Sequence, residues 1–342
     1  MEQEPMHTRQ PVVVGVDLGG TKVLAGVVGQ DTTVLSRVKR RTATYRDQPA
    51  ALLDLLAEVI RSAAEQAGQA LDAIAAVGVG VPGSLDLDRS VVLVAPNLGW
   101  KNLPARDELH QRLGGLPVFL DNDVRCAALA EHALGAGAGR RSMVAIFVGT
   151  GVGGGLIEDG QLVRGTRGGA GEIGHMVLRA KGPRCSCGRR GCLEALAARP
   201  AVVRFVAKQI RKGKRTTLTH ASSNGAQRLT SGELREAVRQ GDRVAIRAVR
   251  RSARYVGLAA GGLVNLLDPE LVVLGGGVVD ALGQQYVDWA AGRARAQILA
   301  ERTRHLPIVA AKLGDDAGLL GAALAARQGL QAAREPLAAA GD

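Results

Sequence analysis

Short apolar runs separated by glycine-containing turns open the chain. Val12 to Val16, apolar apart from Gly15, leads into the sequence D-L-G-G-T-K; Val23 to Val28 is a second apolar run, and Thr33 to Val38 alternates apolar and polar residues. Runs rich in β-branched side chains and bounded by turn residues are typical of strands. The pattern therefore predicts a three-stranded meander with a glycine turn at its first corner.

The same pattern returns further along the chain. Met143 to Val148 is apolar, GTGVGGG follows, and Leu156 to Val163 contains a hairpin turn at Glu158-Asp159-Gly160; Leu271 to Leu274 also runs into three glycines. Two strand–glycine turn–strand units, about a domain apart, indicate an internally duplicated architecture.

Helical and strand periodicities fill the rest of the chain. Helices are expected at 50–67, 122–134, 200–210, 232–240, 242–267, 279–299 and 315–328, and further strands at 74–81, 117–120 and 307–311. The length of 342 residues suits about two domains, and the boundary is expected near Leu120 to Asn122, where a strand passes into a helix.

Composition excludes several classes of protein. The N-terminal sequence MEQEPMHTRQP is polar and lacks the apolar segment of a signal peptide, and the longest apolar stretch, Tyr255 to Leu267, is too short to span a bilayer. Four cysteines, three of them grouped near a histidine, suit a reducing compartment better than a disulfide framework. These features predict a cytoplasmic protein without a membrane segment.

The net charge of +12 is concentrated in one segment. Arg199 to Arg254 holds 15 Lys or Arg and 3 acidic residues, which equals the whole excess. A nucleic-acid surface is one interpretation, but the segment has a single aromatic residue, Phe205, and no recognisable DNA-binding motif. A solvated helical face or a general attraction for anionic substrates explains the charge as well, so a nucleic-acid partner is not favoured.

A cluster of potential metal ligands lies near the middle of the chain. Cys185, Cys187 and Cys192 fall within eight residues, and His175 precedes the first by ten positions. Three thiolates and one imidazole form a closed tetrahedral zinc set, which is typical of structural sites. The spacing C-x-C-x4-C is a poor fit to a C-x-x-C redox pair.

The glycine turns favour phosphate binding over dinucleotide binding. Gly149 to Gly154 matches G-x-G-x-x-G, but another strand follows where a dinucleotide fold needs a helix. Turns without Cβ atoms let backbone N–H groups approach phosphate oxygens closely. At the first turn Asp17 could hold hydrated Mg²⁺, while Thr21 and Lys22 could reach phosphate oxygens. Two ordinary hairpin turns are the alternative; the pair of turns together favours phosphate.

Two further groups of polar residues suggest chemistry. Asp121-Asn122-Asp123 begins a helix, so it is either an N-cap or the site of a general base, Asp123, kept ionised by the helix N-terminus; the sequence favours neither. Glu172 and Glu194 flank the zinc ligands, with His175 between them in sequence. Carboxylates, an imidazole and an amide suit a polyhydroxylated ligand, and solvated surface acids are the alternative.

With these motifs assembled, the chain resembles the ROK family (repressor, open reading frame, kinase) of sugar kinases, and within it the bacterial ATP-dependent glucokinases. The likeness covers about Val12 to Arg327. It rests on the order and spacing of GVDLGGTK, GVGVPG, APNLGW, DNDVRCAALAE, FVGTGVGGG, GGAGEIGHM, CSCGRRGCLE and LGGGV.

The resemblance implies a two-lobed, duplicated α/β fold of the actin and hexokinase-like (ribonuclease H-like) class. A small N-terminal lobe at 11–121 would be completed by the C-terminal helix 315–328, and a large lobe with the zinc loop would occupy 122–314. The implied cofactors are ATP, Mg²⁺ and structural Zn²⁺. The implied partners are a hexose, with glucose favoured, and further copies of the chain in a dimer or tetramer.

Roles of individual residues follow from the same resemblance. Asp123 would be the catalytic base. The sugar hydroxyls would be bound by Gly83, Asn97, Asn122, Asp123, Glu172, His175 and Glu194. ATP would be bound by Gly15, Asp17, Gly19, Gly20, Thr21, Lys22, Gly149, Thr150, Gly151, Gly153, Gly154, Gly276 and Gly277. Zinc would be held by His175, Cys185, Cys187 and Cys192, with His175 also facing the sugar.

The expected reaction is transfer of the γ-phosphoryl group of ATP to a hexose, most simply glucose to glucose 6-phosphate. Three alternatives stay open: another hexose such as fructose, mannose or an N-acetylhexosamine; polyphosphate as donor; and a sugar-responsive transcriptional regulator. Family repressors carry an added N-terminal helix-turn-helix, whereas 11 residues precede the first expected strand here, so the regulator is the least favoured.

Overall fold

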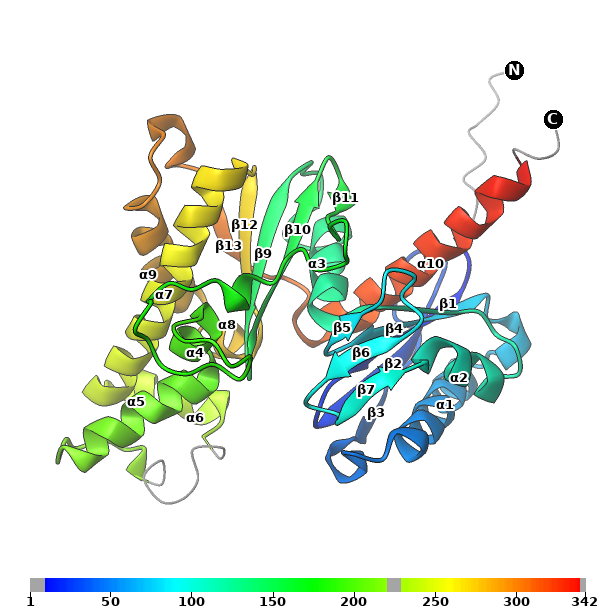
Figure 1. The fold of residues 1–342 in the computed structure, drawn as a ribbon, viewed down its shortest axis with the longest axis horizontal. Coiled ribbons are helices and arrows are strands. Elements are labelled where there is room, and N and C mark those ends of the chain that lie inside the picture. Colours follow the sequence, from blue (N-terminus) through cyan, green and yellow to red (C-terminus); the bar gives the residue numbers. More distant parts are fainter. Residues whose placement is uncertain (1–9, 220–228, 339–342) are drawn as a thin grey trace. The chain divides into compact units, whose positions relative to one another are not determined.

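The structure is a computed structural model, and it describes residues 10–219 and 229–338. The chain divides into two compact units. The N-terminal unit comprises the residues up to Ala130, the segment Arg164–Gly169 and the residues from Asp315 on; the C-terminal unit comprises Glu131–Val163 and Ala170–Gly314. Figure 1 shows the elements of both.

The N-terminal unit is built on a five-stranded sheet in the order β3-β2-β1-β4-β8. Its strands are β1 (Val13–Leu18), β2 (Lys22–Val28), β3 (Val38–Arg41), β4 (Ala76–Val81) and β8 (Val118–Asn122). β1 pairs antiparallel with β2 and parallel with β4, which pairs parallel with β8. The carboxyl ends of β1, β4 and β8 therefore lie at one edge of this sheet.

Helices cover both faces of this sheet. Val14 and Val16 face one side and share a core with the apolar face of α1 (Pro49–Gln66). Alternation along β1 sends Gly15 to the other face, where α10 (Ala317–Ala338) packs on β1 and β4. A Cβ on Gly15 would overlap the carbonyl oxygen of Leu319, so glycine is required there for the close approach of α10.

Two smaller parts complete the N-terminal unit. A three-stranded antiparallel sheet contains β5 (Ser84–Leu85), β6 (Val92–Ala95) and β7 (Trp100–Leu103). The helices α2 (Ala105–Arg112) and α3 (Asp123–Ala133) flank β8 in the sequence.

The C-terminal unit repeats the arrangement of the first. Its sheet has the order β11-β10-β9-β12-β13, from β9 (Met143–Val148), β10 (Val152–Glu158), β11 (Gln161–Leu162), β12 (Leu271–Gly275) and β13 (Ile308–Ala310). β9 pairs antiparallel with β10 and parallel with β12, as β1 does with β2 and β4. The expected internal duplication is thus visible in strand order and direction.

Helices form the rest of the C-terminal unit. They are α4 (Leu193–Ala197), α5 (Arg199–Arg211), α6 (Ser231–Arg239), α7 (Arg243–Leu267), α8 (Gly277–Leu282) and α9 (Gln284–Arg295). The buried residues of α7 pack against α9, α5 and α4 in one continuous core. No helix in the described ranges is both long and apolar enough to cross a membrane.

The structure departs from the sequence-based elements in three places. The third strand of the meander is Val38–Arg41, not Thr33 to Val38, because Ser36 bonds by its hydroxyl to Val27 N and Ala63 O in place of a strand ladder. The expected helix 279–299 is two helices, α8 and α9, separated at Gly283 with φ 60°. The small sheet β5–β7 was not expected.

The division between the units also falls later than Asp121. It lies inside α3 after Ala130. The first turns of α3 stay with the N-terminal unit because the helix packs closely on neighbours there: a Cβ on Gly80 would lie 3.2 Å from the Asp123 Cα, and one on Gly321 would overlap the carbonyl of Cys126.

Candidate active-site residues in the two units

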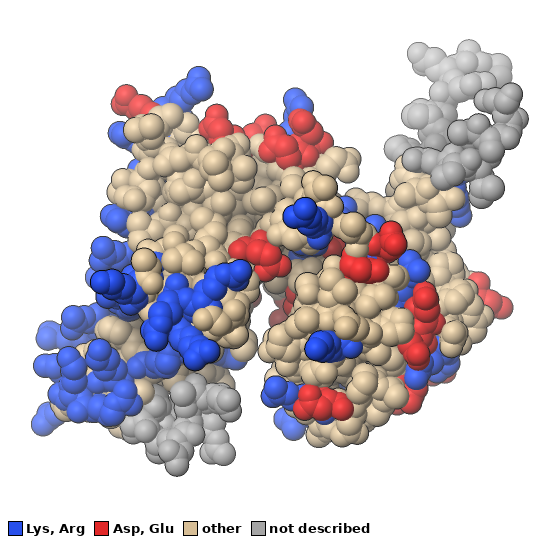
Figure 2. Space-filling view, in the orientation of Figure 1, with Lys and Arg blue, Asp and Glu red and all other residues tan. Residues whose placement is uncertain are grey.

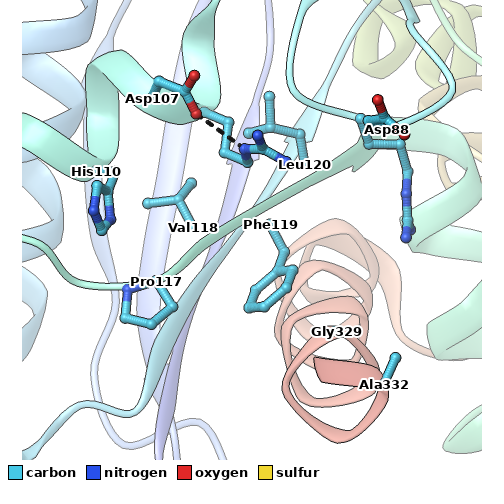
Figure 3. Close-up of a pocket in the computed structure, with 11 residues that line it drawn as sticks. Asp88, Asp107, His110, Pro117, Val118, Phe119, Leu120, Gly329 and Ala332 are labelled. Atoms are coloured by element: carbon cyan, nitrogen blue, oxygen red, sulfur yellow. Dashed lines mark hydrogen bonds and ion pairs between the residues drawn. The ribbon is translucent and has the colours of Figure 1, made fainter. Parts of the chain in front are cut away.

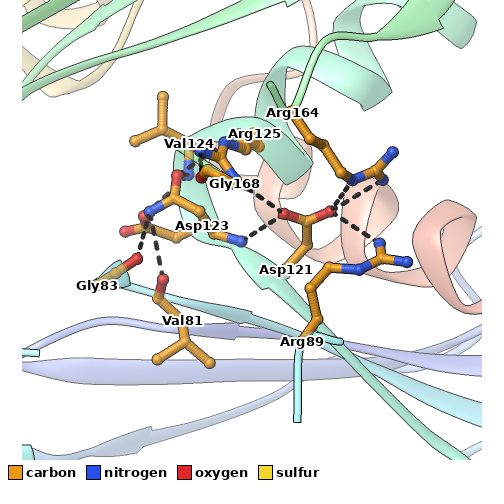
Figure 4. Close-up of polar contacts among 10 residues, drawn as sticks. Val81, Gly83, Arg89, Asp121, Asp123, Val124, Arg125, Arg164 and Gly168 are labelled. Carbon is orange, nitrogen blue, oxygen red and sulfur yellow. Dashed lines mark hydrogen bonds and ion pairs between the residues drawn. The ribbon is translucent and has the colours of Figure 1, made fainter. Parts of the chain in front are cut away.

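The corner between β8 and α3 is fixed by Asn122. Its Oδ1 accepts hydrogen bonds from the backbone N–H groups of Val124 (3.0 Å) and Arg125 (3.1 Å), and its Nδ2 donates to the carbonyl of Gly83 at 3.2 Å (Figure 4). Asn122 is therefore the N-cap of α3 and ties it to the turn after β4. This supports the capping interpretation for Asn122, and its contact with a sugar stays a prediction.

Asp123 occupies the first position of α3, half-buried. Its Oδ1 accepts the backbone N–H of Val124 at 2.9 Å. A carboxylate in the first turn is stabilised in its ionised form by the helix N-terminus. The location meets the requirements for a base, namely an anchored side chain at the carboxyl edge of the sheet.

The sequence analysis treats Asp121 only as part of this helix start, whereas in the structure Asp121 is the centre of a group of ion pairs. Only 1% exposed, it lies among three arginines (Figure 4). Arg164 contacts its Oδ2 at 2.9 Å and Arg89 at 3.3 Å, and Arg125 lies 3.9 Å from Oδ1. Its Oδ1 also accepts the N–H of Asn122 at 2.8 Å. Asp121 thus anchors both the corner between β8 and α3 and the segment Arg164–Gly169.

The first glycine corner, which contains Gly19 and Gly20 between β1 and β2, lies at the same edge of the sheet. The register pairs Asp17 with Gly80 and Gly80 with Asp121 across the parallel strands. The pKa of the buried Cys126 thiol is raised by burial and then by the negative charges of Asp121, Asp123 and Asp17. The residues proposed for metal and base chemistry are therefore near neighbours in this unit.

Three charged side chains, Asp17, Lys22 and Asp315, lie close together at this corner. Burial raises the pKa of Asp17, while the nearby Lys22 lowers it and Asp315 raises it. Lys22 Nζ lies 3.4 Å from Asp315 Oδ1, and a Cβ on Gly318, in the first turn of α10, would lie 2.6 Å from the Asp17 carboxyl carbon. Asp17 therefore packs against the start of α10.

The other sugar and phosphate candidates of this unit surround the corner. The N–H of Gly19 bonds to the carbonyl of Lys22 at 2.8 Å, and Thr42 Oγ1 donates to the carbonyl of Gly19. Asn97 lies against the corner, since a Cβ on Gly20 would be 3.0 Å from the Asn97 Cβ. Gly15 does not line the corner, because it lies inside β1 and admits α10.

The second glycine corner, Gly149–Gly151, joins β9 to β10. The N–H of Gly149 bonds to the carbonyl of Gly151 at 2.9 Å, and Arg199 Nη2 donates to Thr150 Oγ1 at 2.9 Å. Gly276, with φ 85°, caps α8 at the end of the neighbouring strand, where a Cβ would lie 2.7 Å from Val148 N. Gly276-Gly277 and the corner therefore lie at one edge of this sheet.

Three glycines of GTGVGGG, Gly153, Gly154 and Gly155, lie in β10 beyond the corner. A Cβ on Gly154 would overlap the side chain of Ile173. Gly154 thus serves the packing of the 3-10 helix Ile173–His175 on β10, and Gly153 lies in the strand beside it. The approach of a phosphate to the backbone at Gly149–Gly151 stays a prediction.

The four proposed zinc ligands come together. One ligand atom from each of His175, Cys185, Cys187 and Cys192 lies within 4.8 Å of all the others. The Cys185 sulfur lies 3.8 Å from His175 Nδ1, and the Cys187 and Cys192 sulfurs are 3.7 Å apart. A backbone hydrogen bond from Arg189 lowers the pKa of Cys187 to about 7, which favours a thiolate. Three sulfurs and one imidazole at these spacings fit a tetrahedral Zn²⁺.

Glu194 links this cluster to the second corner. Its Oε1 accepts from the Ser186 hydroxyl at 2.9 Å, and its Oε2 accepts from Val152 N at 3.3 Å. A Cβ on Gly151 would lie 2.7 Å from Oε2. Glu172 is exposed and precedes the 3-10 helix that carries His175. The C-terminal unit therefore gathers the metal ligands, both acids and the second corner.

The sequence analysis did not identify Glu131, which is buried in the structure. Its side chain is fully buried and accepts from the N–H groups of Ala136 (2.9 Å), Lys312 (2.9 Å) and Leu313 (2.8 Å). An acid that follows directly on apolar residues, in α3 for Glu131 and in β8 for Asp121, is the signal that identifies both, because a buried charge needs partners.

Comparisons with known proteins agree with this arrangement. A model of the ROK family matches residues 13–329. A glucokinase of Thermotoga maritima is 36% identical over 91% of this chain and 96% of its own. The solved ROK family glucokinase of Streptomyces griseus, in complex with glucose and AMPPNP, is 36% identical, covers 93% and 99% of the two chains and has a TM-score of 0.80.

The family also contains regulators. A xylose repressor of Caldicellulosiruptor bescii is 30% identical over 90% of this chain but 76% of its own. The duplicated two-domain fold, of the actin-like class, is shared with the solved family members. Matched from its first strand to its last helix, the chain belongs to the ROK family.

Proposed function

We propose that the protein is an ATP-dependent hexose kinase, most simply a glucokinase that forms glucose 6-phosphate. The observation that carries the proposal is the grouping of reactive residues at the carboxyl edge of each sheet. In the N-terminal unit these are Asp17, the first glycine corner and Asp123. In open α/β sheets, ligands bind outside the carboxyl ends of the strands.

Asp123 would take the proton from the primary hydroxyl of the hexose, whose oxygen attacks the γ-phosphoryl group in line. Asn97, Glu172 and Glu194 would bind the other hydroxyls, and backbone N–H groups of the two glycine corners would hold the phosphates. Asp17 would hold Mg²⁺, which supplies positive charge to the phosphates when bound.

The metal cluster would serve this site by position. With His175 Nδ1 directed at the cysteines, its Nε2 is the nitrogen left to face a sugar hydroxyl. Bound Zn²⁺ would cross-link the loop and so fix His175, Glu172 and Glu194. We further propose a cytoplasmic homo-oligomer, a dimer or tetramer, which sedimentation would test.

The test is release of ADP across a panel of hexoses, with ATP and polyphosphate compared as donors. Asp123→Asn should lower kcat by about 100-fold or more, because the lost carboxylate accepts the proton in the transition state. The affinity for the hexose should stay within a few-fold of that of the unaltered protein. Asp72→Asn, at an exposed position of the same unit, is the matched control. A near-normal kcat for Asp123→Asn would exclude the base.

A transcriptional regulator is the second candidate, favoured by the similarity to the xylose repressor and by the basic segment. It predicts salt-dependent DNA binding with no ADP release on any hexose. That pair of results would overturn the kinase proposal.

A further inference from the structure

Unpaired positive charge gathers on one part of the C-terminal unit. Figure 2 shows Lys and Arg covering the surface over α5 and the neighbouring helices, with few acidic side chains among them. Within this area a cavity of about 420 Å³ is lined by Gln209, Val244 and four cations, Lys214, Arg215, Arg243 and Arg247. Its volume is within the range of small-molecule sites, about 300–1,000 Å³.

These cations lack the partners that arginines have elsewhere. Across residues 10–219 and 229–338, none of the four forms an ion pair with a carboxylate. A second cavity, of about 380 Å³ in the N-terminal unit, provides the contrast (Figure 3). There Arg106 pairs with Asp107 at 3.1 Å and Arg89 with Asp121 at 3.3 Å. Of these two cavities, the basic cavity is the one whose cations are not neutralised by carboxylates of the described residues.

The walls of the basic cavity are held in place. Helix α5 ends at Arg211; Gly213 follows with φ 71°, and the N–H of Lys214 bonds back to the carbonyl of Gln209 at 3.1 Å. The next residues are bound to the start of α7, since Asp242 Oδ2 accepts the Thr216 hydroxyl at 2.7 Å and the Thr217 N–H at 2.6 Å. The cation-bearing segments are therefore positioned before any ligand arrives, which lowers the entropic cost of binding.

Asp242 directly precedes Arg243 in the chain, and its carboxylate oxygens already accept hydrogen bonds. Its Oδ1 caps α7 through Val244 N and Ala245 N, while Oδ2 takes the threonine bonds. Burial raises the pKa of Asp242, but these hydrogen bonds outweigh burial and leave the pKa below its usual range. Set against four cations, this one anion leaves a clear positive excess.

We propose that this cavity binds a short linear chain of phosphates. Three of the four cations are arginines, whose planar forks match phosphate oxygens in pairs. One phosphate group carries at most about two negative charges, so it would leave much of the excess unmatched, whereas a chain of phosphates balances it. The ligand is free oligophosphate, with no nucleoside attached.

A nucleic acid fits the same surface less well. Proteins that bind single-stranded nucleic acids stack the bases on aromatic side chains. On this surface, arginine side chains already cover the aromatic rings. Arg251 lies 5.9 Å from the ring centroid of Phe205 and 5.1 Å from that of Tyr255, and Arg250 lies 5.1 Å from that of Trp289. The concave shape, too, suits a compact ligand.

Calorimetric titration of the full chain with tripolyphosphate tests the proposal. Glucose and AMPPNP are present at saturation, so that phosphate sites of the proposed kinase centre are filled. We expect binding that weakens as salt rises, and inorganic phosphate should bind at least tenfold more weakly. AMPPNP added beyond saturation of the kinase centre should show no second binding event, and a second event would make a nucleotide, not free oligophosphate, the ligand.

Two pairs of variants locate the site. Arg215→Glu with Arg247→Glu should weaken tripolyphosphate binding at least tenfold, and the neutral pair Arg215→Gln with Arg247→Gln should weaken it less. Arg295→Glu with Arg302→Glu, exposed in the same unit, makes the same change in net charge away from the cavity and should leave affinity unchanged. Unaltered ADP release would show that the variants are folded.

Three results would overturn the proposal: loss of tripolyphosphate binding once AMPPNP is added, equal weakening by the control pair, or tighter binding of duplex DNA than of tripolyphosphate at the same salt concentration.

Discussion

Replacing Asp121 by Asn removes the negative charge at the centre of three arginines while keeping the size of the side chain. Removing one partner of a buried ion pair costs about 3 to 5 kcal/mol. Here the Arg89 and Arg164 side chains are 36% and 31% exposed and can turn to water, whereas Arg125 is only 8% exposed. We therefore expect the N-terminal unit to lose about 2 to 3 kcal/mol of its free energy of unfolding.

Urea unfolding followed by tryptophan fluorescence measures this loss. The chain has two tryptophans, and Trp100 is buried in the N-terminal unit. In a Trp289→Phe background, which keeps an aromatic ring beside Arg250, Trp100 reports on that unit alone. A loss of 2 to 3 kcal/mol should lower the urea midpoint by about 1 M.

Asp54→Asn is the matched control. Asp54 also pairs with an arginine, Arg112, at 2.7 Å, but its side chain is 67% exposed, so the substitution should cost about 0.5 kcal/mol or less. If Asp121→Asn shifts the midpoint no more than Asp54→Asn does, the arginines do not depend on Asp121 and the reasoning is wrong.

Three further predictions follow from single contacts. Gly78→Ala should cost about 3 kcal/mol because its Cβ would overlap the carbonyl of Ala322, whereas Gly292→Ala, in open space within α9, should stabilise slightly; urea midpoints compare the two. Asp17→Asn should lower kcat about 100-fold yet raise the melting temperature at pH 7. Because burial raises the pKa of Asp17, its contribution to the stability of the folded protein is complete in acid, where Asp17 is protonated, and is lost as pH rises through that pKa. The gain in melting temperature should therefore vanish at low pH. Cys187→Ser should abolish stoichiometric zinc, measured by chelator-triggered release, and raise KM for the hexose about tenfold, whereas Cys126→Ala, outside the cluster, should retain the metal.

Much of the fold could be predicted because turn residues and the periodicity of apolar residues are local features of the sequence. The hairpin at Asp159-Gly160 has φ values of 48° and 75°, as its turn residues require, and the repeated strand–glycine–strand pattern corresponds to two sheets of the same order. The grouping of His175 with three cysteines was predictable for a similar reason, since the cysteines lie in one short loop.

Long-range partners could not be predicted. Arg89 and Arg164 lie 32 and 43 residues from Asp121, and nothing in their local sequence connects them to it. Glycines were misjudged for the same reason: Gly15 and Gly154 belong to glycine-rich motifs, but their missing Cβ atoms admit Leu319 and Ile173, from distant segments. A glycine-rich motif indicates that some group approaches the backbone closely. The fold is needed to show whether that group is a ligand or another part of the chain.

The packing of α10 has a consequence for synthesis of the chain. Gly15 and Gly78 leave one face of the first sheet open to the backbone of Leu319 and Ala322, which the ribosome makes only after the C-terminal unit. The unit begun first is therefore finished last, after the whole C-terminal unit has emerged. Until then an apolar sheet face waits uncovered, and a chain stopped before Asp315 should be captured by chaperones through that face.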